Sequence, residues 1–285
     1  MKNKIVMITG ATSGIGAVAA LELARFGARV VGVGRNPEKC TAVASHITKE
    51  TGNPSVEYLV ADLSSQDQIR QLAEVFKVKY TRLDVLVNNA GAYFSKRQES
   101  IDGIEMTLAL NHLNYFLLTN LLVDTLKASA PARIVSVSSN AHQVGHINFA
   151  DIEGRRRYLS WPAYGQSKLA NVLFTYELAR RLDGGGVTAT TMHPGFVASN
   201  FGHNNQDLMG WGTRLAQKIA GHSPEQGAHT MIYLASSPEV EGVTGKYFVD
   251  EKAVPSSPAT YDEGTARRLW ELSKAMTSTK VQILT

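Results

Sequence analysis

The stretch Thr9-Gly10-Ala11-Thr12-Ser13-Gly14-Ile15-Gly16 decides how the rest of the chain is interpreted. Apolar residues 5–9 predict a buried strand before it, and residues 17–26 have helical periodicity after it. Glycines at such a junction let the backbone turn tightly and approach a pyrophosphate, which would lie on the amide groups and positive dipole end of the helix. Glycines also serve ordinary turns, but the flanking strand and helix favour a nucleotide-binding loop.

The alternation of strand and helix continues along the chain. Expected strands cover residues 5–9, 28–34, 56–61, 83–87, 133–137, 187–192 and 246–249, and expected helices cover residues 17–26, 37–50, 104–127, 161–182, 224–235 and 263–274, with a further helix beginning near Ser65. This pattern predicts an α/β protein: a single-domain, Rossmann-like doubly wound fold with a mainly parallel seven-stranded sheet flanked by helices. The carboxyl ends of parallel strands lie at one edge, so the residues that follow them are expected to share one ligand site.

Composition is that of one ordinary globular domain. The 285 residues are 44% hydrophobic and 19% charged, and no repeat or linker divides them, so we expect residues 1–285 to form one domain. The net charge of +4 is spread along the chain, and the one basic run, Arg155-Arg156-Arg157, is interpreted as a solvated face; no nucleic-acid partner is expected. The single cysteine, Cys40, is expected to pack internally and suits a reducing compartment.

No targeting or membrane segment is expected. The N-terminus has no signal-peptide cleavage pattern, and the longest apolar stretch, residues 108–126, is interrupted by several polar side chains. We therefore expect a cytoplasmic protein without a membrane span.

The end of the second strand, Gly34-Arg35-Asn36, is where a dinucleotide fold contacts the adenosine ribose. An acid there would accept from the ribose hydroxyls, whereas a base would bind a 2′-phosphate. No acid is present, and the forked donors of Arg35 suit a phosphate, so NADP is predicted over NAD. The alternative is that Arg35 is a solvated loop residue.

Two further loops follow strands at the same edge. Asp62 and Leu63 follow the third strand, and Asp62 could accept from an adenine amino group or cap the helix that begins near Ser65. The fourth strand leads into Asn88-Asn89-Ala90-Gly91, whose small, turn-prone residues suit a place where backbone passes close to a flat group.

Tyr164 and Lys168 lie four residues apart on the helix expected at 161–182, so both side chains face the same way, roughly 5–6 Å apart at Cβ. A tyrosine acting as acid and base near neutrality needs its pKa lowered by about three units from about 10. A neighbouring cation at about 4 Å contributes about 4 kcal/mol only where the effective dielectric constant is near 20, so such a site must hold little water. Otherwise Tyr164 would be half buried and Lys168 solvated.

Other polar residues fall near the same edge. Asn111 lies in an apolar helix, where it must either bond to neighbouring backbone or support catalysis. Ser139 follows the fifth strand, and His193-Pro194-Gly195 ends the sixth. His142 and His146 are four residues apart, but no acid or cysteine joins them at ligand spacing, so no metal site is predicted.

Large apolar residues are concentrated in residues 196–221, which form either a lid over the substrate or a helix that covers the domain core. Residues 250–285 are expected to be a C-terminal extension. The expected substrate pocket is apolar and aromatic, which favours a hydrophobic aldehyde, ketone or alcohol, and its residues are Tyr93, Ala141, Trp161, Phe196, Leu208 and Trp211.

Together these motifs resemble the short-chain dehydrogenase/reductase family over nearly the whole chain. Residues 9–16 match its Thr-Gly-x-x-x-Gly-x-Gly cofactor loop, residues 88–91 its Asn-Asn-Ala-Gly turn, and Asn111, Ser139, Tyr164 and Lys168 its catalytic tetrad. Pro194-Gly195 and Ser199 match the Pro-Gly-x-x-x-Thr segment beside the nicotinamide, with serine in place of threonine. Three runs are also similar to the retinol dehydrogenase-like branch: Ser138-Ser139-x-Ala141-His142, Tyr164-x-x-Ser167-Lys168-Leu169-Ala170-Asn171 and Arg268-Leu269-Trp270.

Two departures limit the resemblance. Animal members of that branch often carry a membrane anchor that is not expected here, so retinoid specificity is not implied. Ser13 occupies a place where many NADP-using relatives have a base, so the prediction of NADP depends on Arg35.

The resemblance implies a reversible hydride transfer between NADPH and a carbonyl. Ser139 and Tyr164 would bind the carbonyl oxygen, Tyr164 would supply the proton, Lys168 would lower the Tyr164 pKa and hold the nicotinamide ribose, and Asn111 would position a water. The implied cofactor contacts are Gly10, Thr12, Ser13, Gly14, Ile15, Gly16, Arg35, Asn36, Asp62, Leu63, Asn89, Ala90, Gly91, Tyr164, Lys168, Pro194, Gly195, Val197 and Ser199. A catalytically silent NADP sensor on the same fold is the alternative, and homodimer and homotetramer both stay open.

Overall fold

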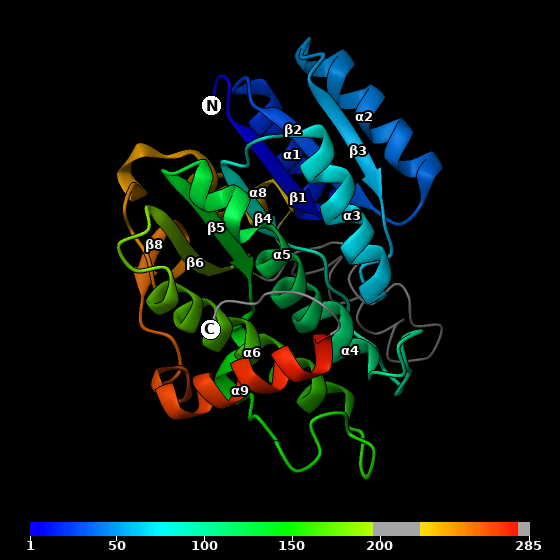
Figure 1. Ribbon diagram of the computed structural model, residues 1–285, viewed down its shortest axis with the longest axis vertical. Helices are drawn as coiled ribbons and strands as arrows, with labels where there is room; N and C mark the ends of the chain where they lie inside the picture. Colours follow the sequence, from blue (N-terminus) through cyan, green and yellow to red (C-terminus); the bar gives the residue numbers. More distant parts are fainter. Residues whose placement is uncertain (196–222, 279–285) are drawn as a thin grey trace.

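The computed structural model describes residues 1–195 and 223–278 as one sheet between two layers of helices (Figure 1). Its strands are β1 Ile5–Thr9, β2 Arg29–Gly34, β3 Val56–Val60, β4 Val85–Asn88, β5 Ala132–Val137, β6 Val187–His193, β7 Lys246–Val249 and β8 Lys252–Val254. Its α-helices are α1 Gly14–Arg25, α2 Pro37–Thr51, α3 Gln66–Lys79, α4 Met106–Leu108, α5 Asn114–Ala128, α6 Ser160–Arg181, α8 Pro224–Ser236 and α9 Glu263–Thr277. A π turn, η1 Ala109–Leu113, and 3₁₀ turns η2 Asn140–Val144, η3 Pro238–Val240 and η4 Pro258–Tyr261 complete the described elements.

The strand order is β3-β2-β1-β4-β5-β6-β7-β8, and the first seven strands are parallel. The chain winds outward in one direction from β1 to β3 and in the other from β4 onward, so the order reverses between β1 and β4. This confirms the doubly wound fold, and it places the expected ligand-binding crevice at that reversal.

The sheet has eight strands where seven were expected. The additional strand, β8, pairs antiparallel to β7, with Tyr247 opposite Val254. Asp250 and Glu251 make the reversal with positive φ values of 47° and 64°. Two-residue hairpin turns in which both residues have positive φ usually contain asparagine or glycine. The sequence Asp-Glu, followed by only three strand residues, therefore gave no recognisable signal of a hairpin.

Alternate residues of β1 enter separate cores on the two faces of the sheet. Ile5 and Met7 pack in one apolar cluster and Val6 and Ile8 in the other. Helices α3, α5 and α6 supply the first cluster, and α1, α2 and α8 supply the second. Burial on both faces explains why this strand reads as a continuous apolar run.

The single helix expected at 104–127 is divided into α4, η1 and α5. Glu105 begins α4 by accepting from the amides of Thr107 and Leu108, both at 2.8 Å, with its two carboxylate oxygens. The π turn then inserts an irregularity that contains Asn111. Such turns accommodate an extra residue within a helix and occur frequently at functional sites.

The described part of the C-terminal extension belongs to the core. Helix α9 packs against α6 (Figure 1), and the Trp270 ring lies 4.9 Å from Phe116 and 5.8 Å from Phe174 between ring centroids. The expected lid at 196–221 lies outside the described residues. Within residues 1–195 and 223–278, no helix has the length and apolar character needed to cross a membrane.

Candidate active site

A cleft of ≈ 730 Å³ opens at the carboxyl ends of the parallel strands. Its lining includes most residues that the sequence singles out: Gly10, Thr12, Ser13, Gly14, Ile15, Arg35, Asn36, Asp62, Leu63, Asn89, Ala90, Gly91, Ser139, Trp161, Tyr164, Lys168, Pro194 and Gly195. Four predicted residues do not line it, namely Gly16, Tyr93, Asn111 and Ala141. Five others, Phe196, Val197, Ser199, Leu208 and Trp211, lie outside the described residues.

The glycine loop packs tightly against the turn after β4. Gly10 has a φ of 66°, and a Cβ added to it would lie 2.9 Å from the Ala90 Cα. A Cβ on Gly16 would lie 2.6 Å from the Gly10 carbonyl oxygen. Glycine at position 16 therefore allows the start of α1 to pack against the loop. Gly16 lies at this packed contact and does not line the cleft.

Thr9 ties these two loops together, a role that the sequence did not reveal. Its Oγ1 accepts from the amides of Asn89, at 2.8 Å, and Ala90, at 3.0 Å, and donates to the Val87 carbonyl at 3.2 Å. Asn89 Nδ2 returns a bond of 2.7 Å to the Thr9 carbonyl. The available signal was a hydroxyl at the end of an otherwise apolar strand.

The N-terminus of α1 fits a pyrophosphate. Within residues 1–195 and 223–278 no side chain caps it, although Ser13 is at the cap position, and its first turn contains no acid. By contrast, Asn36 caps α2 by accepting from the Lys39 amide at 2.7 Å. Among the residues that the structure describes, no capping side chain or first-turn carboxylate therefore competes for the amide groups at the start of α1, as anion binding requires.

The adenosine end of the cleft carries two cations. Arg35 and Lys39 are exposed, and both line the cleft. Lys39 was missed because it lies inside the next helix, three residues past its cap. Asp62 also lines the cleft, and it accepts from the amide and hydroxyl of Ser64 at 2.9 and 2.7 Å. The capping alternative for Asp62 is wrong, since Ser65 caps α3.

The opposite wall of the cleft is formed by the start of α6 and the end of β5. Tyr164 and Lys168 are only 7% and 4% exposed, so the alternative of a half-buried tyrosine with a solvated lysine is wrong. Tyr164 shares a side-chain hydrogen bond with Ser139. The Ser139 Oγ also accepts from the Ala141 amide at 3.2 Å, which leaves its own O–H to donate elsewhere. Ala141, which was predicted to contact substrate, thus contacts Ser139 through its amide and does not line the cleft.

Burial controls the protonation of this pair. It raises the pKa of Tyr164 well above its ordinary value, and the hydrogen bond from Ser139 lowers that pKa by less. It also lowers the pKa of Lys168 to about 8. The expectation that the Lys168 ammonium lowers the Tyr164 pKa is therefore not met, because desolvation penalises the charged form of both groups. In the protein alone, the phenol stays protonated at neutral pH.

Asn111 fixes the backbone beside the catalytic wall. Its Oδ1 accepts from the Ala92 amide at 2.8 Å, and its Nδ2 donates to the Ala92 carbonyl at 2.9 Å and to Ser167 Oγ at 3.1 Å. A Cβ on Gly91 would lie 3.1 Å from the same Oδ1. Of the two interpretations of Asn111, bonding to neighbouring backbone or support of catalysis, the structure thus shows the first.

Aromatic side chains surround Tyr164. The Tyr93 and Trp161 rings lie 6.0 and 5.9 Å from the Tyr164 ring, in edge-on arrangements. Tyr93 is buried and donates to Ser160 Oγ at 2.8 Å, so it supports the start of α6 and does not line the cleft. Trp161 lines the cleft and is 55% exposed, which leaves an apolar surface beside the phenol.

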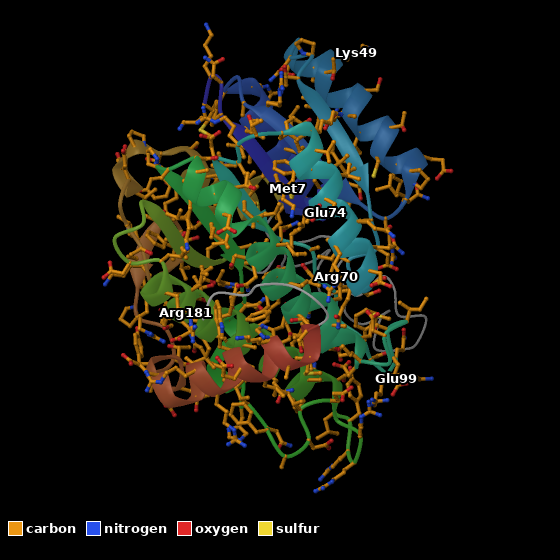
Figure 2. The ribbon with its side chains drawn as sticks, viewed as in Figure 1. Met7, Lys49, Arg70, Glu74, Glu99 and Arg181 are labelled. Atoms are coloured by element: carbon orange, nitrogen blue, oxygen red, sulfur yellow. The ribbon has the colours of Figure 1, made fainter. Side chains whose placement is uncertain are left out.

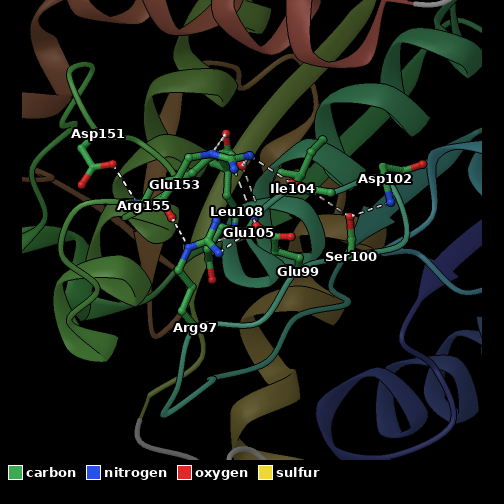
Figure 3. Close-up of polar contacts among 11 residues, drawn as sticks. Arg97, Glu99, Ser100, Asp102, Ile104, Glu105, Leu108, Asp151, Glu153 and Arg155 are labelled. Atoms are coloured by element: carbon green, nitrogen blue, oxygen red, sulfur yellow. Dashed lines mark hydrogen bonds and ion pairs between the residues drawn. The ribbon is translucent and has the colours of Figure 1, made fainter.

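Charged side chains hold two loops together beneath this wall (Figure 3). Arg97 donates to the Glu153 carbonyl at 3.0 Å, the Glu153 carboxylate accepts from the Glu105 amide at 3.3 Å, and Arg155 pairs with that carboxylate at 3.1 Å. Nearby, the Tyr158 hydroxyl donates to the carbonyl of a second cleft-lining aromatic, Phe94, at 3.0 Å. The loop after β4 and the loop before α6 are thus fixed to each other.

The remaining candidates have structural surroundings. His142 is buried between the Ser139 carbonyl, 2.7 Å from its Nδ1, and the Ser257 amide, which donates to its Nε2 at 3.1 Å. Cys40 is buried, as expected. Arg155, Arg156 and Arg157 are exposed. Residues 1–195 and 223–278 contain no group of three or more His, Cys, Asp or Glu that could hold a metal.

A glycine loop at the switch point of a parallel sheet, facing a serine and a buried tyrosine and lysine across one cleft, defines the class of dinucleotide-dependent oxidoreductases. The family model of short chain dehydrogenases matches residues 4–209, and the chain belongs to this family, whose members bind a nicotinamide cofactor.

Similar proteins support the same assignment. Retinol dehydrogenase 14 from Homo sapiens is 42% identical over 97% of this chain and 87% of its own length. Polyprenol dehydrogenase from Homo sapiens is 43% identical over 96% of this chain and 85% of its own. Among solved structures, the RhlG/NADP active-site complex of Pseudomonas aeruginosa has a TM-score of 0.70, with 28% identity over 87% of this chain and 94% of that one. The chain is thus retinol dehydrogenase-like.

Proposed function

We propose that this protein is an NADP-dependent oxidoreductase that transfers a hydride between NADPH and a hydrophobic aldehyde or ketone, or the corresponding alcohol. The observation that carries the proposal is the grouping of Ser139, Tyr164 and Lys168 on one wall of the cleft that the glycine loop also lines. When bound, the cofactor supplies the hydride, and the protein supplies placement, charge stabilisation and the proton.

Ser139 and Tyr164 bind the substrate oxygen. Two hydroxyls aimed at that atom stabilise the negative charge that develops on it as the hydride arrives. Tyr164 then donates its proton, and the burial that raises its pKa keeps this proton in place at neutral pH.

Lys168 and Asn111 organise the floor of the cleft. The Lys168 ammonium lies near Gly91, with its Nζ 3.6 Å from where a Cβ on that glycine would be. Because Gly91 has no side chain, nothing from this residue covers the ammonium, and Lys168 would hold the nicotinamide ribose, the role that family resemblance assigns to it. Asn111 holds the adjoining turn through both of its amide bonds to Ala92.

The preference for NADP rests on charge at the adenosine end. Arg35 and Lys39 line the cleft after β2, and the end of that strand, Gly34-Arg35-Asn36, contains no acid. A hydrogen bond to a charged group contributes about 1.5–3 kcal/mol, which corresponds to a roughly 10- to 150-fold preference for the phosphorylated cofactor. The NADP bound in the Pseudomonas aeruginosa complex supports this choice.

The substrate class follows from the aromatic wall and the relatives. Trp161, which lies beside the Tyr164 ring, and Phe94 both line the cleft with apolar surface. The two human relatives are named for retinol and polyprenol, which are both long apolar alcohols. A long apolar aldehyde or alcohol therefore suits this cleft better than a small polar one.

The test is a cofactor-oxidation screen of the purified protein with NADPH and NADH over aliphatic, aromatic and retinoid carbonyls. We expect NADPH to be oxidised fastest with long apolar carbonyls. Tight NADPH binding without turnover on any carbonyl or alcohol would instead favour a silent NADP-binding protein.

A further inference from the structure

Three buried side chains form a continuous hydrogen-bond chain behind the catalytic wall. Ser273 of α9 lies 2.8 Å, Oγ to Nε2, from His112 of the π turn. The His112 Nδ1 lies 3.3 Å from the Oδ1 of Asn171 on α6. The Asn171 Nδ2 donates to the Asn111 carbonyl at 2.9 Å. Each of these three side chains is at most 1% exposed.

The direction of every bond in this chain is determined. The Asn171 Nδ2 lies within 3.3 Å of two main-chain carbonyls, those of Asn111 and Val137, and carbonyls only accept. The amide nitrogen must therefore face them, and Oδ1 must accept from His112 Nδ1–H. Burial lowers the pKa of His112 to about 4, so the ring is neutral and its Nε2 accepts from the Ser273 hydroxyl.

This chain ends on the carbonyl that Lys168 uses. The Val137 carbonyl accepts from Lys168 Nζ at 3.2 Å and from Asn171 Nδ2 at 3.3 Å. Val137 is the last residue of β5, two positions before Ser139. Asn171 thus contacts both the main chain that holds the Lys168 ammonium and the main chain of Asn111.

Contacts with α3 and α6 hold helix α9 in place, so the position of Ser273 is fixed relative to His112. From α3, Gln66 donates to the Met276 carbonyl at 2.8 Å and Arg70 to the Thr277 carbonyl at 2.7 Å. From α6, the Arg181 guanidinium lies 4.4 Å from the centre of the Trp270 ring. Figure 2 labels both arginines, on the two helices next to α9.

We propose that Asn171, oriented by His112 and Ser273, is a positioning residue that sets the location of the Lys168 ammonium and of the Asn111 turn. The C-terminal helix then acts on catalysis through hydrogen bonds and not only through packing. The inference rests on the proposed function for the catalytic part, because Lys168 matters to turnover only if the cleft performs the reaction.

The first test replaces Asn171 by leucine, which has a similar size but no hydrogen bonds. We expect kcat to fall roughly 10- to 100-fold, as small misplacements of catalytic groups do, with the KM for the carbonyl changed only a few-fold. Ser273→Ala should also lower kcat, but by less than Asn171→Leu does. Ser273→Thr keeps the hydroxyl, so its kcat should be close to that of the wild-type protein.

A matched control is Asn120→Leu. Asn120 is also buried, but among the described residues its Nδ2 donates only to the Phe116 carbonyl of its own helix, at 2.7 Å. This variant should lose stability and keep the kcat of the wild-type protein. The control separates loss of a buried amide from loss of the positioning contact.

The decisive readout does not need activity. The protonation of Lys168 is followed by NMR with ¹⁵N-labelled lysine side chains, and its resonance is identified by its absence in Lys168→Arg. A shifted Lys168 titration in Asn171→Leu, but not in Asn120→Leu, supports the proposal. An unchanged Lys168 titration in Asn171→Leu overturns it. A wild-type protein that reduces no carbonyl contradicts the proposed function and leaves this titration as the test of positioning.

Discussion

The Lys168 ammonium lies 5.6 Å from the centre of the Tyr164 ring and donates to the Val137 carbonyl at 3.2 Å. The two side chains therefore lie on one buried wall of the cleft, where the Lys168 ammonium faces the Tyr164 ring and the end of β5. Burial thus decides both protonation states: it keeps the Tyr164 phenol neutral and makes the Lys168 ammonium easier to deprotonate.

The first prediction concerns the pH dependence of cofactor binding. The pKa of Lys168 is lowered to about 8, so its charge is present below that pH and is lost as the pH rises through it. NADPH affinity, measured by fluorescence titration, should weaken above pH 8 in the wild-type protein. In Lys168→Arg the side chain stays charged, so the affinity should not change there. An equal pH dependence in both proteins would contradict the assignment.

The second prediction concerns cofactor choice. Arg35→Ala should raise the KM for NADPH roughly 10- to 150-fold and leave the KM for NADH nearly unchanged, because a charged hydrogen bond to the 2′-phosphate is lost. Lys39→Ala should act in the same direction. Lys49→Ala is the control, since Lys49 lies in the last turn of α2 (Figure 2), away from the cleft lining. Equal losses for NADPH and NADH would argue against a phosphate contact.

The third prediction concerns substrate contact. Trp161 is 55% exposed in the cleft, and covering a large apolar side chain contributes about 1.5–3 kcal/mol. Trp161→Ala should therefore raise the KM for a long apolar aldehyde about 10-fold or more and leave NADPH affinity unchanged. The neighbouring Leu159, also exposed but outside the cleft lining, provides the control variant Leu159→Ala. The hypothesis fails if both variants behave alike.

The fourth prediction concerns stability in acid. Burial lowers the pKa of His112 from 6.5 to about 4. The unfolded chain therefore binds more protons than the folded protein between these values, so the free energy of unfolding falls as the pH drops from 6.5 toward 4. The difference corresponds to about 3 kcal/mol.

Urea unfolding at several pH values checks this. His112→Gln cannot bind that proton, so the variant should lose this part of the acid dependence while other groups keep theirs. The same slope in the variant and the wild-type protein between pH 6.5 and 4 would show that His112 is not the group responsible.

The sequence predicted the fold well, because each local signal agreed with the next. The apolar run of β1, the glycine loop and the helix after it are contiguous, so their geometry follows from nearby residues. The hairpin at Asp250 and Glu251 and the π turn around Asn111 were not predicted, since both depend on tertiary contacts that override local preference.

The candidate site could be predicted where a sequence motif falls at the sheet edge that the fold makes the ligand site. Ser139, Tyr164 and Lys168 follow from helical spacing and from the shared sheet edge. Thr9 and Asn171 were missed because their partners lie far away in the sequence, and Lys39 was missed because it lies inside the helix after the strand end. The sign of the Tyr164 pKa shift was also wrong, since the sequence shows the neighbouring cation but not the degree of burial.

The most direct test of the account is Tyr164→Phe, which removes one hydroxyl and keeps the ring packing. NADPH affinity and the thermal unfolding midpoint should stay close to those of the wild-type protein, and kcat for carbonyl reduction should fall by at least about 10²- to 10⁴-fold, the usual contribution of general acid catalysis. A variant that binds NADPH and still reduces the carbonyl at a near wild-type rate would contradict the assignment of Tyr164 as the proton donor.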